Sequence, residues 1–125
     1  MSGRVVHFEV PYDDAARARA FYAEAFGWNL MEMPEMGYTM VATGPVNEQS
    51  APAEPGFVNG GMFERTGQLG HPSITIDVPD IEAALKTVES LGGKALREKT
   101  PVGDMGFSAY FEDSEGNVLG LWQSA

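Results

Sequence analysis

The segment of residues 5–10 alternates between apolar and polar positions with a period of two. One face carries His7 and Glu9, and the other carries Val6, Phe8 and Val10. This alternation predicts a strand with one buried face. A helical spacing follows from residue 15 to residue 26, with Asp14 placed to cap its start and Gly27 to end it. Its predicted apolar side is Ala15, Ala18, Phe21, Tyr22, Ala25 and Phe26.

Three further strands are predicted at residues 28–33, 38–43 and 57–64, the last two separated by a long loop at 44–56 that is typical of a binding segment or a mobile one. The pattern then restarts. An alternating strand at 73–78 precedes a helix at 81–91, capped by Asp80, and the final strands are expected at 94–99, 107–112 and 117–122.

Each half therefore has the order strand, helix, three strands, which indicates an internal duplication of about sixty residues. We expect one domain over residues 1–125, with a first module of about 4–64 and a second of about 71–123. The repeat favours an α+β fold with the helices on one face of the sheet.

Composition and charge exclude several classes of function. Eight Lys and Arg against 18 Asp and Glu give a net charge of −10, which disfavours binding to nucleic acid or to an anionic membrane. The absence of cysteine excludes disulfides, thiolate zinc sites and a cysteine nucleophile. The start of the sequence lacks the apolar stretch of a signal peptide, and we therefore expect a cytoplasmic protein without a membrane segment.

Four segments resemble the vicinal oxygen chelate superfamily, which includes glyoxalase I, bleomycin-resistance proteins and extradiol dioxygenases. They are residues 7–14 (HFEVPYDD), 21–28 (FYAEAFGW), 80–84 (DIEAA) and 110–122 (YFEDSEGNVLGLW). Within the superfamily the chain is similar to a glyoxalase-related subgroup whose substrates are mostly unassigned. The resemblance implies two βαβββ modules that form a curved mixed sheet around a cup, with the helices on the outer face.

The resemblance also implies a divalent metal held by one residue from the first and one from the last strand of each module. These positions are expected to be His7, Gly60, Ser73 and Gly120, of which only His7 is a usual ligand. Since a catalytic metal needs about three protein ligands, no cofactor is predicted at them. The alternative is a divalent metal at a displaced site of His7 with His71 and Glu64.

His7 and Glu9 are the candidate catalytic residues, because they share a strand face and an imidazole beside a carboxylate can move a proton. The candidate ligand-binding residues are Met62, Ser73, Tyr110, Gly120 and Trp122, which the family register turns toward the cup. The alternative is structural: a hydrogen-bonded histidine on a polar sheet face, and aromatic side chains that fill the space of a missing metal site.

These observations favour a protein that binds a small organic molecule in the cup, and they leave open whether it is also a lyase or isomerase. Two alternatives remain: a metal-dependent glyoxalase-type lyase that uses the displaced His and Glu site, and a non-catalytic protein that sequesters its ligand. A homodimer is expected only because symmetric dimers are common.

Overall fold

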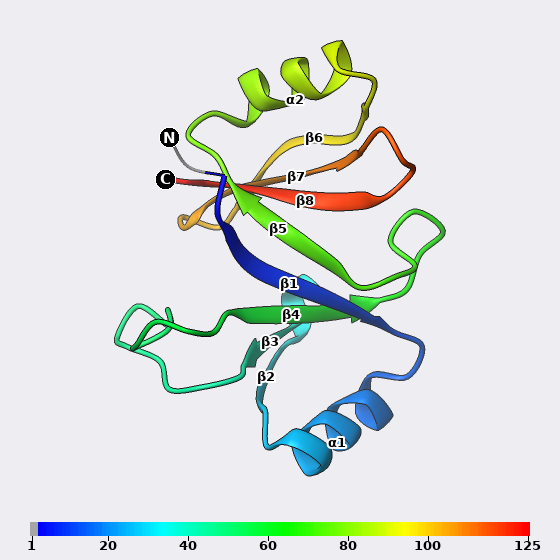
Figure 1. The fold of residues 1–125 in the computed structure, drawn as a ribbon. Helices are drawn as coiled ribbons and strands as arrows, with labels where there is room; N and C mark the ends of the chain where they lie inside the picture. The colour runs from blue at the N-terminus through cyan, green and yellow to red at the C-terminus, as the bar shows by residue number, and fades with distance from the viewer. Residues whose placement is uncertain (1–2) are drawn as a thin grey trace. The chain divides into compact units, whose positions relative to one another are not determined.

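The computed structural model describes residues 3–125, and in this range the chain forms eight strands and two α-helices. Met1 and Ser2 of the predicted domain lie outside the described residues. The chain divides into two compact units (Figure 1). The N-terminal unit is His7–Pro72, and the C-terminal unit is Ser73–Ala125 together with the residues up to Val6.

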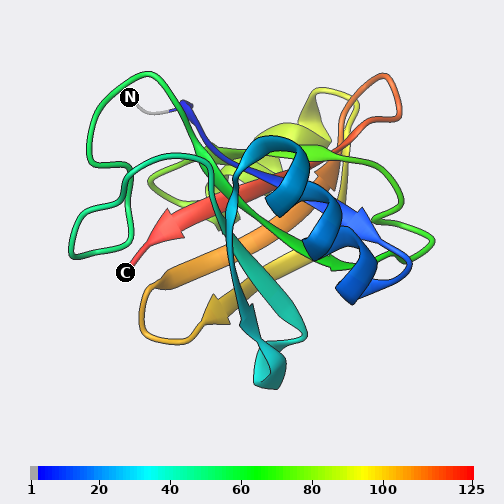
Figure 2. The ribbon, with the colours of Figure 1, turned by 90° about the horizontal axis from the view of Figure 1, so that it is seen from below.

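The N-terminal unit contains one βαβββ module. Its elements are β1 (Val5–Tyr12, whose first two residues belong to the other unit), α1 (Ala15–Phe26), β2 (Asn29–Met33), the 3₁₀ turn η1 (Pro34–Met36), β3 (Tyr38–Ala42) and β4 (Asn59–Glu64). The strand order is β2, β3, β4, β1, in which β1 and β4 are parallel and the other pairs antiparallel. Figure 2 shows η1 at the tip of the β2–β3 hairpin.

The C-terminal unit repeats this arrangement. It consists of β5 (Ser73–Asp77), α2 (Ile81–Ser90), β6 (Lys94–Val102), β7 (Gly106–Glu112) and β8 (Val118–Ser124). The strand order is β5, β8, β7, β6, with β5 and β8 parallel and the other pairs antiparallel. The predicted α+β fold of two βαβββ modules is confirmed. Neither helix of the described chain, at 12 and 10 residues, is long and apolar enough to cross a membrane.

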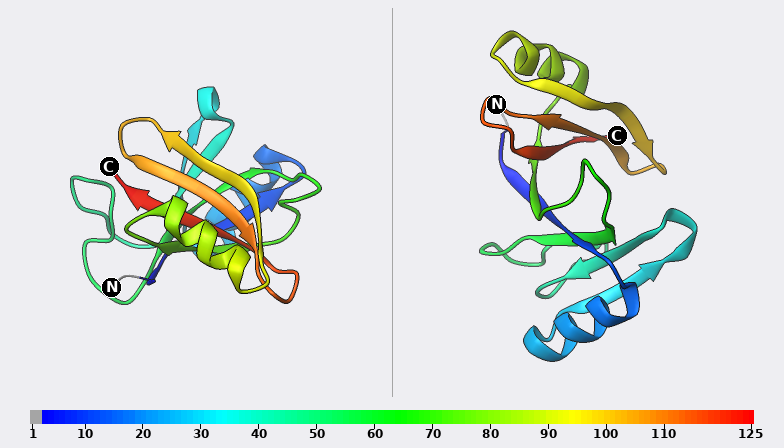
Figure 3. Two further views of the ribbon diagram at one scale, coloured as in Figure 1. Left: turned by 90° about the horizontal axis from the view of Figure 1, so that it is seen from above. Right: turned by 90° about the vertical axis from the view of Figure 1, so that its right-hand side faces the viewer.

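Helix α2 supplies the hydrophobic core of the C-terminal unit. The Asp80 side chain accepts a hydrogen bond from the Ala83 amide at 3.2 Å and caps the start of the helix. The helix lies across the β6–β8 strands (Figure 3). The buried side chains of this core are Ile81, Leu85, Ala109, Phe111 and Leu121.

Helix α1 begins and ends where the sequence predicts, but only part of its predicted apolar side is covered. Asp14 accepts a hydrogen bond from the Arg17 amide, and Gly27 ends the helix with a left-handed φ of 72°. Phe21 and Phe26, predicted to face the core, are 58% and 65% exposed. Tyr22, which belongs to the predicted apolar side, does pack, stacked on Trp28 at 4.7 Å, and an Arg19–Glu32 ion pair of 2.8 Å also holds the helix.

The turn between β7 and β8 is closed by one carboxylate. Asp113 accepts hydrogen bonds from the backbone amides of Glu115 and Asn117 and from the Asn117 side chain. These bonds, the backbone bond of Asn117 first, hold the pKa of Asp113 below its usual value.

We expect Asp113→Ala to lower the melting temperature of the protein, because the turn loses all three side-chain bonds. Asp113→Asn is the matched control, since its amide oxygen can still accept the two backbone bonds. Thermal denaturation monitored by circular dichroism measures both variants. An alanine variant as stable as the asparagine variant would show that the carboxylate does not hold the turn.

Candidate functional site

Three polar side chains of the N-terminal unit meet on the face of the sheet that carries His7. His7 and Glu9 project from the same face of β1, and the parallel register pairs them with Asn59 and Gly61 of β4. Tyr38, at the start of β3, extends its ring across Gly61 to reach them, and a Cβ atom on Gly61 would overlap the Tyr38 hydroxyl. The glycine therefore provides the space that the tyrosine ring occupies.

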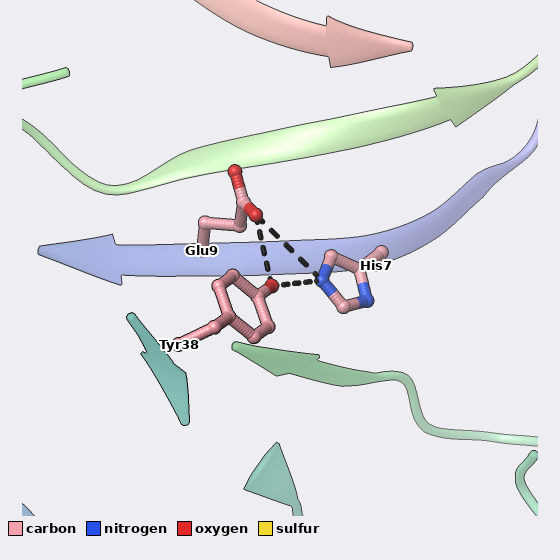
Figure 4. A network of polar contacts seen from close by, with 3 residues as sticks. All are labelled: His7, Glu9 and Tyr38. Atoms are coloured by element: carbon pink, nitrogen blue, oxygen red, sulfur yellow. Dashed lines mark hydrogen bonds and ion pairs between the residues drawn. The ribbon is translucent and has the colours of Figure 1, made fainter. Parts of the chain in front are cut away.

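The hydroxyl of Tyr38 bridges the imidazole and the carboxylate (Figure 4). Tyr38 Oη lies 2.8 Å from His7 Nε2 and donates a hydrogen bond of 2.8 Å to Glu9 Oε2. The two outer atoms, His7 Nε2 and Glu9 Oε2, are 4.0 Å apart. Glu9 is only 7% exposed, whereas the side chain of His7 is 29% exposed. The carboxylate is thus shielded, whereas solvent or a ligand can reach the imidazole.

Burial sets the charge of His7, and the hydrogen-bond network sets its tautomer. Burial lowers the pKa of the imidazole from 6.5 to about 4, so the ring is neutral at pH 7 and its contact with Glu9 is not an ion pair. The single phenol proton of Tyr38 is donated to Glu9, so Tyr38 Oη accepts from His7 Nε2–H. The other ring nitrogen, Nδ1, then carries the lone pair and is the basic atom of the site.

The register of β4 differs by one residue from the expected one. Gly61 pairs with Glu9, two residues after His7, as Gly120 pairs with Thr75, two residues after Ser73. Gly61, and not Gly60, is therefore the counterpart of Gly120. A Cβ on Gly60 would instead meet the Phe8 ring at 2.8 Å, on the opposite face of the sheet.

The same shift removes Met62 from the predicted site. Met62 is fully buried and alternates with Gly61, so it lies on the face opposite His7. Its expected place, two residues beyond the glycine, is taken by Phe63, whose ring stacks against Tyr38 with centroids 6.3 Å apart. The expectation that Met62 shares a face with His7 is therefore wrong.

The expected register holds in the C-terminal unit. Ladder pairing places Tyr110 opposite Gly120 and Ser108 opposite Trp122, while the intervening residues Ala109 and Leu121 belong to the core beneath α2. The helix-free face thus carries four of the predicted residues, Ser73, Tyr110, Gly120 and Trp122. The guanidinium of Arg97 also lies 5.8 Å from the Tyr110 ring centroid. Their role in binding a ligand stays a prediction.

Comparisons with known proteins find similar sequences. A family model described as bleomycin resistance protein-like N-terminal matches residues 4–44. A glyoxylase-like domain-containing protein of Didymella fabae is 28% identical over 123 residues, covering 94% of this chain and 91% of that protein. A probable lactoylglutathione lyase of Vibrio cholerae is 29% identical over 127 residues, covering 97% and 91%.

Solved structures show the same fold. A variant of Streptomyces coelicolor methylmalonyl-CoA epimerase, in complex with 2-nitronate-propionyl-CoA, has a TM-score of 0.66 at 16% identity over 100% of this chain and 99% of that chain. The chain is thus similar to bleomycin resistance protein-like and glyoxylase-like sequences, in line with its resemblance to the vicinal oxygen chelate superfamily. The sequence relatives are distant, and their printed names describe a glyoxylase-like protein and a probable lactoylglutathione lyase.

The metal positions that the superfamily resemblance implies do not fit a divalent ion. With the corrected register they are His7 and Gly61 in one unit and Ser73 and Gly120 in the other. One imidazole and one hydroxyl fall short of the roughly three protein ligands that a catalytic metal needs. Between His7 and Glu9, the place of an ion is taken by the Tyr38 hydroxyl, 2.8 Å from a ligand atom of each.

The displaced metal site predicted from His7, His71 and Glu64 is wrong. Glu64 pairs with Tyr12, five residues beyond His7 along β1, which places the two side chains about 16 Å apart on a strand. His71 is exposed in the segment that follows β4. Across residues 3–125, no three His, Asp or Glu side chains converge as metal ligands would.

Tyr38 is the site residue that the sequence did not reveal. It reads as an ordinary strand residue, and it lies 29 positions from Glu9 along the chain. The signal was the Gly60–Gly61 pair, since glycine inside a strand marks a place where another group approaches closely. From the sequence, Gly60 is expected only as one of the metal positions that the resemblance implies.

Proposed function

We propose that the protein binds a small organic molecule through Nδ1 of His7. The observation that supports this is the Glu9–Tyr38–His7 chain, which holds the imidazole in one tautomer, while burial keeps the ring neutral. A ligand hydroxyl or N–H group can then donate to Nδ1 without a competing proton. Such preorganisation favours affinity, because the site does not have to reorder on binding.

The low pKa of His7 favours binding over proton abstraction. A general base works best with a pKa near the working pH, and a pKa of about 4 makes Nδ1 a weak base at pH 7. A hydrogen-bond acceptor has no such requirement. A ligand-sequestering role, as in bleomycin-resistance proteins, therefore agrees better with the site than a lyase does.

We expect that a small molecule selected by thermal shift from a metabolite panel stabilises the protein by about 2.7 kcal/mol when present at 100 times its Kd. His7→Gln should weaken its binding at least about tenfold, a loss of about 1.4 kcal/mol. His71→Gln, which changes an exposed loop histidine, is the matched control and should bind normally. Equal affinity in both variants would contradict the proposal.

A second function, proton transfer on a carbonyl compound, is favoured by one feature of the same site. The phenol links the Glu9 carboxylate to His7, so the negative charge of Glu9 can stabilise the positive charge on an imidazole that takes up a proton. The lyase and epimerase names of relatives support this class. Deuterium incorporated from D2O into the carbon skeleton of the bound compound would support proton transfer over binding alone.

The homodimer and the cytoplasmic location stay predictions.

A further inference from the structure

Asn59 lies beside His7 on the neighbouring strand. The parallel register pairs the two residues, and alternation along β4 places Asn59 on the same face as Gly61. Its side-chain oxygen Oδ1 accepts a hydrogen bond of 2.9 Å from the Thr43 amide. Thr43 is itself fastened to β4, because its hydroxyl donates to the Val58 carbonyl at 2.8 Å. The amide plane of Asn59 is thereby fixed, with Nδ2 directed away from Thr43.

The Nδ2 group of Asn59 is buried and has no hydrogen-bond partner among residues 3–125. Buried amide donors in folded proteins almost always have a partner, so an unpaired donor indicates a group that something else satisfies. The Thr43 bond prevents the amide from rotating to find a protein acceptor. Asn59 is also the ladder partner of His7, whose Nδ1 we assign as an acceptor.

We infer that Asn59 is a ligand-specificity residue whose Nδ2 donates to a carbonyl oxygen of the molecule that His7 binds. This inference rests on the proposed function. A donor from Asn59 beside an acceptor on His7 matches a molecule with a carbonyl oxygen next to an N–H group, of which a cyclic amide is the simplest. The buried Glu9 near the imidazole and the net charge of −10 favour a neutral ligand over a carboxylate.

Two simple lactams test the inference without changing the protein. 2-Pyrrolidone carries the carbonyl and the N–H side by side, whereas N-methyl-2-pyrrolidone lacks the donor for His7. We expect 2-pyrrolidone to shift the side-chain amide resonance of Asn59 and the His7 imidazole resonances in an NMR titration. The methylated lactam should bind at least about tenfold more weakly. Failure of 2-pyrrolidone to bind, or equal binding of the two lactams, would overturn the inference.

Asn59→Asp tests the amide itself, because it keeps the oxygen that accepts from Thr43 and replaces only the donor. Asn47→Asp makes the same chemical change in the 44–58 loop, where the Asn47 oxygen accepts two backbone bonds. We expect Asn59→Asp to weaken the binding of 2-pyrrolidone at least about tenfold. Asn47→Asp should bind 2-pyrrolidone as tightly as the unchanged protein. Binding that requires His7 but not Asn59 would refute this inference alone, whereas binding indifferent to His7→Gln would refute the proposed function.

Discussion

Gly61→Ala is expected to destabilise the protein by about 1–3 kcal/mol, the usual cost of forcing an extra methyl group into a packed site. The added Cβ would overlap Tyr38, because the three atoms closest to its position are the hydroxyl oxygen and two ring carbons of that residue. The ring must then leave its place, and His7 and Glu9 both lose their phenol contact. Ligand binding should fall with the stability, because the tautomer of His7 is no longer fixed.

Gly67→Ala is the matched control for this substitution, because a Cβ at Gly67 has no neighbour within 4 Å. Thermal melts should show a drop of about 5–15 °C for Gly61→Ala and little change for Gly67→Ala. In a Tyr38→Ala background, the cost of Gly61→Ala should largely disappear, because the overlapping ring is gone. A double-mutant cycle without coupling would mean that the tyrosine does not depend on the glycine.

Lowering the pH from 7 to 4 is expected to remove about 3 kcal/mol of stability through His7 alone. The folded state holds the pKa of His7 at about 4, below its ordinary value of 6.5. Between these two values the unfolded chain binds a proton that the folded chain does not. The stabilisation is therefore complete above pH 6.5 and is lost as the pH falls through 4.

Comparison with His7→Gln isolates this contribution, since the other acidic groups titrate alike in both proteins. Urea denaturation at a series of pH values should give a difference in unfolding free energy that changes steeply between pH 6.5 and 4 and is flat above. The His7 imidazole resonance, identified by its loss in the variant, should titrate near pH 4. Parallel stability curves for the two proteins would refute the assignment of a buried neutral imidazole.

Local signals in the sequence were sufficient to predict the elements. Asp14 and Gly27 bound α1 because a capping carboxylate and a left-handed glycine act on neighbouring backbone groups. The duplicated order of strand and helix was equally visible. The exposure of Phe21 and Phe26 was not, because the Tyr22–Trp28 stack and the Arg19–Glu32 pair involve residues that follow the helix in the chain.

The site was only half predictable for a similar reason. His7 and Glu9 follow from alternation within one strand, and their shared face is confirmed by the common Tyr38 partner. The register of β4 could not be derived, since Gly60 and Gly61 have no side chains to show which faces the core. Tyr38 reaches the site from another strand, and such long-range contacts leave no periodic trace in the sequence.

The fit between Gly61 and Tyr38 constrains how this site could change during evolution. A glutamate at position 61 would supply the metal ligand that the superfamily resemblance implies, but its side chain would begin inside the Tyr38 ring. Tyr38 would have to be replaced first, at a stage when the site does not yet have a second metal ligand. A metal ligand at position 61 therefore requires an intermediate that has neither the tyrosine network nor a metal site, which makes this change hard to reach one substitution at a time.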